Sequence, residues 1–99
     1  IGNPEEISYR VIGFNHPARK MQVLVESYKP GGDTGAIFSH DAQEAGLVLE
    51  RRIELTVGDQ AWVLEAGDGY YFDSNSPHRF RNLGAGMARI ISAITPPSY

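Results

Sequence analysis

Two histidines and a glutamate are the residues of this chain whose types and spacing could do chemistry. His40 lies four residues before Glu44, just ahead of an apolar run, and His78 follows Pro77 at the start of another predicted strand. Two imidazoles and a carboxylate can form a facial triad that leaves open positions on a transition metal. Three such residues also occur by chance in many chains of this length, so exposed polar loop residues are the alternative interpretation.

The composition restricts the class of protein that could use such a site. A chain of 99 residues suits one domain. Its 9 basic and 12 acidic residues give a net charge of −3, so this domain is not expected to hold DNA by itself. The absence of cysteine excludes disulfides and thiolate metal sites and fits a reducing cytoplasm. No apolar run approaches the roughly 18 residues of a membrane span, so we expect a soluble chain with no membrane partner.

One hairpin is predicted directly from the sequence. Residues 53–57 and 60–64 are β-type runs separated by Gly58-Asp59, a two-residue turn. The turn fixes the register, so that Leu55 should face Trp62 and Ile53 should face Leu64 on one apolar side. We therefore expect Trp62 to pack in the core.

Several other short runs resemble strands, and clusters of Gly, Pro, Asn, Asp and Ser separate them. They cover residues 9–14, 21–28, 36–39, 47–49, 70–72, 79–81 and 87–94. No segment has a helical period. This pattern predicts an all-β fold, a small antiparallel β-barrel or jelly roll, since closure or double-sheet packing removes exposed edges.

The spacing of the candidate residues resembles both motifs of the cupin superfamily. In the first motif, Gly32 is followed after five residues by Phe38-Ser39-His40, after three more by Glu44, and after six more by Arg51. In the second motif, Gly67 is followed after five residues by Asp73-Ser74-Asn75, after two more by His78, and after three more by Asn82. The resemblance implies the cupin β-barrel over residues 1–99.

The same resemblance implies a metal site with one ligand missing. His40, Glu44 and His78 match three of the four metal ligands of the family, whereas Phe38 replaces the fourth, and a phenyl ring cannot coordinate a metal. One divalent ion, Zn, Mn, Fe or Ni, would then complete its shell with water or a ligand, and its affinity should be lower than at a four-ligand site. An interior without metal is the alternative.

A narrower resemblance is carried by the stretch "YYFDSNSPHRFRN" at residues 70–82 and by Thr95-Pro96-Pro97 near the C-terminus. These segments are similar to the C-terminal cupin of bacterial helix-turn-helix transcriptional regulators. That resemblance implies a small-molecule sensor that helps to form a homodimer. The chain begins at Ile1 rather than Met, so we expect an N-terminal helix-turn-helix domain in a longer protein, through which alone the protein would contact DNA.

Strand alternation predicts which side chains point into the barrel. His78, Phe80 and Asn82 share one face of their strand, whereas Arg79 and Arg81 point away as solvated residues. Phe38 and His40 share a face by the same rule. We therefore expect a ligand site formed by six residues: Phe38, His40, Glu44, His78, Phe80 and Asn82. Core packing is the alternative role of the two phenylalanines.

Three functions follow from these observations. The first is a ligand-sensing and dimerisation domain of a cytoplasmic regulator, with no catalytic residue. The second is a small metal-dependent enzyme, an oxygenase or isomerase, in which His40, Glu44 and His78 hold the ion. The third is a domain that only dimerises and whose barrel interior binds nothing.

Overall fold

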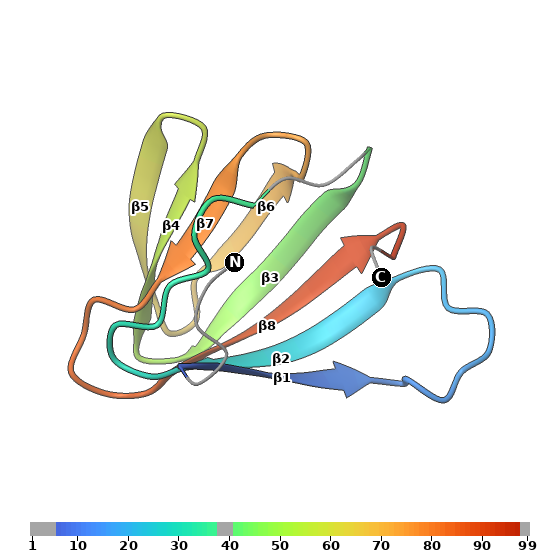
Figure 1. Cartoon of the computed structure of the whole chain (residues 1–99), viewed down its shortest axis with the longest axis horizontal. Coiled ribbons are helices and arrows are strands. Elements are labelled where there is room, and N and C mark those ends of the chain that lie inside the picture. Colours follow the sequence, from blue (N-terminus) through green and yellow to red (C-terminus); the bar gives the residue numbers. More distant parts are fainter. Residues whose placement is uncertain (1–5, 38–40, 98–99) are drawn as a thin grey trace.

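The computed structural model describes residues 6–37 and 41–97, and these contain eight antiparallel strands (Figure 1). The strands are β1 (Ile7–Ile12), β2 (Gln22–Tyr28), β3 (Gln43–Glu50), β4 (Arg52–Val57), β5 (Gln60–Glu65), β6 (Gly69–Asp73), β7 (His78–Arg81) and β8 (Ala88–Thr95). They form a five-stranded sheet in the order β1-β2-β8-β3-β6 and a three-stranded sheet in the order β5-β4-β7. Within these residues there is no helix that could cross a membrane. The all-β jelly-roll prediction is confirmed.

The predicted hairpin is present as β4 and β5. Leu55 faces Trp62 and Ile53 faces Leu64, as the two-residue turn requires. Gly58 in that turn has φ 60°, a left-handed conformation that costs glycine no steric energy. The expected register is therefore confirmed.

Three of the predicted strands differ from the structure by more than one residue. β3 begins at Gln43, earlier than expected, because β6 and β8 pair with it on both sides and compensate for the weak strand preference of Ala45 and Gly46. β1 ends at Ile12, since the chain turns at Gly13 with φ 70°. Of residues 36–39, Ile37 forms only an isolated bridge to His78, and residues 38 and 39 lie outside the described part of the chain.

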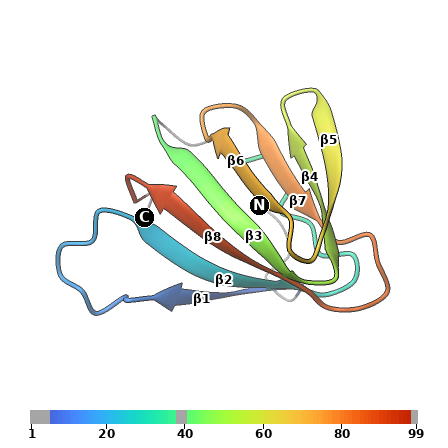
Figure 2. The same cartoon turned by 180° about the vertical axis from the view of Figure 1, so that it is seen from behind.

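The two sheets are joined by a very short connection. Only Arg51 separates β3 from β4, and it has φ 61°, an uncommon conformation for a residue with a side chain. Its guanidinium packs against Gly86, where a Cβ atom would overlap it. Figures 1 and 2 show the sheets diverging away from this connection.

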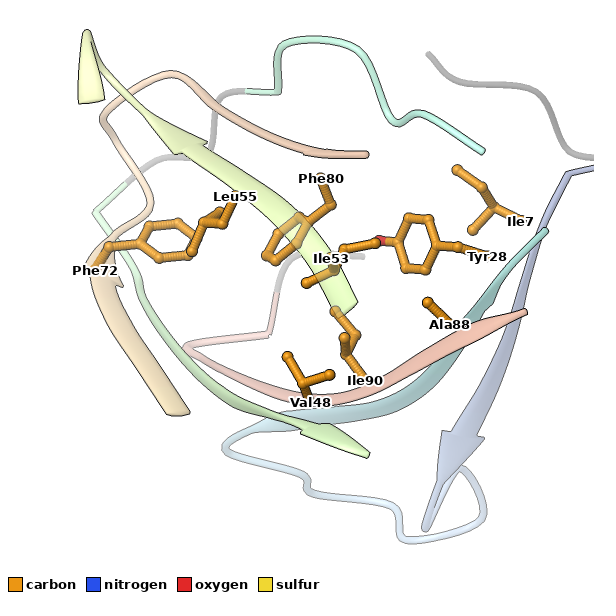
Figure 3. Packing of buried hydrophobic residues seen from close by; sticks show 9 residues of the cluster. All are labelled: Ile7, Tyr28, Val48, Ile53, Leu55, Phe72, Phe80, Ala88 and Ile90. Atoms are coloured by element: carbon orange, nitrogen blue, oxygen red, sulfur yellow. The ribbon is translucent and has the colours of Figure 1, made fainter. Parts of the chain in front are cut away.

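The core fills the space between the sheets and contains a row of aromatic rings (Figure 3). The Phe80 ring lies at the centre, with its centroid 6.3 Å from that of Phe72 and 6.4 Å from that of Tyr28. The aliphatic members of the cluster surround this row: Ile7, Val48, Ile53, Leu55, Ala88 and Ile90. Aromatic pairs at such distances contribute favourable edge and face contacts beyond the burial of apolar area.

The prediction that Trp62 packs in the core is wrong. Its side chain remains 45% exposed, whereas its cross-strand partner Leu55 is only 3% exposed. β5 is an end strand of the smaller sheet, and no strand of the larger sheet pairs with it. The predicted pairing of Trp62 with Leu55 is therefore correct, but the larger sheet does not cover the Trp62 side chain.

Candidate ligand-binding interior

His78 is the first residue of β7 and is buried. Its Nδ1 lies 2.9 Å from the carbonyl oxygen of Ser76. A carbonyl can only accept, so Nδ1 carries the proton and donates it, which leaves Nε2 as the acceptor of the neutral ring. The ring also packs against Phe72, with centroids 4.8 Å apart. His78 thus has a fixed tautomer on the inner side of the barrel.

Glu44 is buried on β3, between β6 and β8. The hydroxyl of Tyr70 donates a hydrogen bond of 3.0 Å to Oε2 of Glu44. Burial, together with the negative charge of Glu26, raises the pKa of Glu44 to about 8, although the Tyr70 hydrogen bond acts in the opposite direction. This carboxyl group is therefore largely protonated at neutral pH.

Glu26 is a second buried carboxylate, and the sequence analysis did not identify it. It lies on β2 and accepts hydrogen bonds of 2.6 Å from the hydroxyls of Tyr28 and Ser92. Burial raises the pKa of Glu26, and these two hydrogen bonds offset part of that effect. The available signal was a single acid within the strand sequence "QVLVESY", on the same face as Tyr28.

Adjacent strands bring these groups into one network. β8 pairs with both β2 and β3, and Ser92 of β8 lies opposite Gly46 of β3. A hydrogen bond with Ser92 affects the pKa of Tyr70, and so do the charges of Glu44 and Glu26. We call Glu26, Tyr28, Glu44, Tyr70 and Ser92 the acid network. None of the ion pairs seen in residues 6–37 and 41–97 involves either acid, so the network has an acidic character without a balancing base.

Of the three candidate metal ligands, Glu44 and His78 lie on the inner face, and His40 lies outside the described residues together with Phe38. The described residues alone contain no cluster of three or more His, Asp or Glu that could hold a metal ion. The geometry of His78 fits a ligand, because a histidine that binds metal commonly donates its other N–H to a carbonyl. Glu44 would first have to lose its proton. The metal site therefore stays a prediction.

Phe80 and Asn82 share the inner face with His78, as the alternation of β7 predicted. The Phe80 ring is at the centre of the core, in contact with three other rings. The Asn82 amide donates to the carbonyls of Tyr28 and Gly86 and accepts from the N–H of Gly84. The side-chain amide of Asn82 is therefore hydrogen-bonded to the backbone. Contact of these two residues with a ligand stays a prediction.

Arg79 and Arg81 point to the outer face, as expected, but they are not simply solvated. Nε of Arg79 donates to Asp33 at 2.8 Å, and Nη2 of Arg81 donates to Glu54 at 2.6 Å. These contacts tie β7 to β4 and to the segment before β3. Neither ion pair includes a member of the acid network.

Comparisons with known proteins relate this geometry to two kinds of protein. The family model Cupin_2, described as a cupin domain, matches residues 24–94. The HTH-type transcriptional regulator PuuR of Escherichia coli (strain K12) is 39% identical over 93 residues, which cover 94% of this chain and 50% of that protein. The chain thus spans about half the length of this curated relative.

Solved structures share the fold at lower identity. The Cupin_2 domain of an XRE family transcriptional regulator from Enterobacter cloacae has a TM-score of 0.85 and 17% identity, and the match covers 94% of this chain and 99% of that one. A sugar phosphate isomerase from a cupin superfamily, from Silicibacter pomeroyi, has a TM-score of 0.83 and 17% identity, with 98% and 69% covered. Both regulators and enzymes therefore use this barrel.

Proposed function

This chain belongs to the Cupin_2 family of cupin domains, and from that premise we propose that it is the small-molecule-sensing domain of a cytoplasmic helix-turn-helix transcriptional regulator. The observation that carries the proposal is the 39% identity to the regulator PuuR over 94% of this chain. A helix-turn-helix domain of the parent protein would contact DNA. The cupin barrel would bind the effector.

The inner face supports a binding role. Glu44, His78 and the hydroxyl of Tyr70 place hydrogen-bonding groups among aromatic rings, which is the usual composition of small-ligand sites. An effector bound there would shift the regulator between two states by its different affinity for each state. No catalytic step is needed.

The charge of the interior favours some effectors over others. An anionic effector near Glu44 would lie beside two buried acids, Glu44 and Glu26, and the acid network contains no base to balance its charge. We therefore expect a small polar metabolite without negative charge. A carboxylate or a phosphate should bind poorly.

Homodimer formation is part of the proposal. β1 is an end strand of the larger sheet, and five of its six residues are exposed. Exposed apolar side chains continue along this strand and into the connection to β2: Tyr9, Val11, Ile12, Phe14 and Met21. An exposed strand edge with apolar neighbours favours association with another chain.

The experiment that tests the sensor function uses the full-length native protein and the DNA that it binds. A library of small polar metabolites is screened for compounds that change the affinity for this DNA. We expect His40→Ala and His78→Ala to abolish the response while the protein stays folded. A double variant that responds normally would contradict the proposal.

A metal-dependent enzyme, an oxygenase or isomerase, is the second candidate. The specific observation in its favour is His78, whose Nδ1–H donates to a carbonyl and whose Nε2 is available to a ligand. A bound ion would supply Lewis acidity, and His78 and Glu44 would help to hold it. Elemental analysis of protein purified without an affinity tag tests this candidate, since less than about a tenth of an equivalent of transition metal would contradict it.

A further inference from the structure

A cavity of about 240 Å³ lies between β4, β5 and β6, and its β6 residues fall within the second cupin motif, residues 67–82. Its walls include three aliphatic side chains and four aromatic ones: Leu55, Val57, Leu64, Trp62, Tyr70, Tyr71 and Phe72. We call it the β4–β6 slot. Figure 3 shows two of its residues, Leu55 and Phe72, side by side at one end of the row of core side chains.

The slot exists because two end strands do not meet. β5 ends the smaller sheet and β6 ends the larger one, and they are joined in sequence by residues 66–68 but not paired with each other. Trp62 therefore faces the gap with 45% of its side chain exposed. A large aromatic side chain on the inner face of a strand would otherwise be covered by the opposite layer.

The size of the slot indicates what it can hold. An engineered apolar cavity of about 150 Å³ in another protein binds benzene. A slot of about 240 Å³ therefore has room for one aromatic ring or branched aliphatic group and a short polar substituent. It is too small for a folded segment of a partner protein.

The polar group of the slot sets the chemistry of the substituent. Tyr70 lines the slot, and its hydroxyl donates to Oε2 of Glu44. Glu44 and Glu26 are buried acids behind this hydroxyl, and none of the slot residues is basic. A hydrogen-bonding group without negative charge is complementary to this end, because a carboxylate would lose hydration there and find no positive charge to compensate for it.

We propose that the β4–β6 slot is a binding site for a small molecule with one aromatic or branched aliphatic body and a non-anionic hydrogen-bonding head placed next to Tyr70. Trp62 and Phe72 contact the body, and Leu55, Val57 and Leu64 cover its other side. The inference rests on the proposed function only in calling this molecule the effector. Binding itself is independent of that role.

The test uses the full-length native protein and a matched pair of probes, 4-fluorobenzyl alcohol and 4-fluorobenzoate. Trp62 is the only tryptophan among these 99 residues, so its indole N–H signal, assigned with Trp62→Phe, reports on the slot. We expect the alcohol to shift this signal saturably with a Kd in the range of about 1 mM, as suits a ligand of this size. The benzoate should bind at least about tenfold more weakly.

Two variants separate slot binding from adsorption elsewhere. Leu64→Trp fills the slot and should weaken alcohol binding at least about tenfold. Leu83→Trp makes the same substitution at an exposed leucine outside the slot and should leave binding unchanged. If Leu64→Trp does not fold, Val57→Phe takes its place as the filling variant.

Three outcomes would overturn the inference: no shift of the Trp62 signal, equal binding of alcohol and benzoate, or equal binding by the filling and control variants. A DNA-binding assay under the same conditions separates the two proposals. Slot binding without a change in DNA affinity would uphold the slot and contradict its role as effector site. An effector response without slot binding would contradict the slot and uphold the sensor function.

Discussion

Gly46 leaves the space that the ring of Tyr70 occupies. The two residues face each other across β3 and β6, and a Cβ atom at position 46 would overlap the phenol. The same atom would lie 2.6 Å from the carbonyl oxygen of Ile91, which is backbone and cannot rotate away. Because Glu44 lies two residues before Gly46 on the same face of β3, the missing side chain lets the Tyr70 hydroxyl reach its carboxyl group.

Gly46→Ala should therefore displace Tyr70 and destabilise the fold by about 1–3 kcal/mol, the usual cost of overpacking a filled space. Urea denaturation measures the loss of stability, and the near-ultraviolet circular dichroism of the tyrosines reports the displacement. Gly69→Ala is the matched control on the neighbouring strand, since its Cβ would make only an ordinary 3.4 Å contact. Equal effects of the two substitutions would contradict this account.

Stability should fall as the pH rises from about 4.5 to about 8. The pKa of Glu44 is raised from 4.5 to about 8 in the folded chain, so the native state binds more protons than the unfolded state across this window. The free energy of unfolding then decreases with pH, since its slope follows the difference in bound protons. The raised pKa of Glu26 acts in the same direction. Each unit of pKa shift corresponds to about 1.4 kcal/mol, so we expect a loss of a few kcal/mol.

Chemical denaturation at pH 5 and pH 8 measures this loss directly. Glu44→Gln keeps the size of the side chain and removes its ionisation, so it should flatten the pH dependence and leave only the part due to Glu26. Glu50→Gln is the control, because this carboxylate lies at the exposed end of the same strand. A pH profile that Glu44→Gln leaves unchanged would show that another group titrates.

The parts of the fold that depend on local patterns could be predicted from the sequence. The register of β4 and β5 follows from a two-residue turn, and the inner position of His78 and Phe80 follows from strand alternation. Trp62 shows the limit of such reasoning. Its pairing with Leu55 is local, but its exposure depends on where the other sheet ends, which no local pattern encodes.

The acid network could not be predicted for a similar reason. In the sequence, Glu26 is an ordinary acid within a predicted strand. In the structure, β8 places Ser92 beside it and β3 places Glu44 near it. These residues are 66 and 18 positions away from Glu26 in the sequence. Only the order of the strands in the sheet brings them together, and turn chemistry does not determine that order.

Ser92→Ala should destabilise the chain by about 1–3 kcal/mol, the cost of leaving a buried polar group without its hydrogen-bond partner. The Ser92 hydroxyl donates to Oε2 of buried Glu26, and alanine would leave that oxygen without this partner. Ser27→Ala is the control, because the hydroxyl of Ser27 contacts Arg89 in an exposed position and should contribute less than about 0.5 kcal/mol. Thermal unfolding ranks the two variants, and a larger effect at Ser27 would contradict the assignment.

Trp62→Ala should cost less stability than Leu55→Ala, although tryptophan is the larger side chain and the two residues face each other. Leu55 is 3% exposed, so its truncation leaves a core cavity at a cost of about 2–5 kcal/mol. Trp62 is 45% exposed and lines a slot that is already open, so its truncation should cost about 1 kcal/mol or less. Urea denaturation compares the two variants, and acrylamide should quench the Trp62 fluorescence of the native protein. If Trp62→Ala were the more destabilising variant, or if acrylamide did not quench the Trp62 fluorescence of the native protein, the slot would be closed in solution.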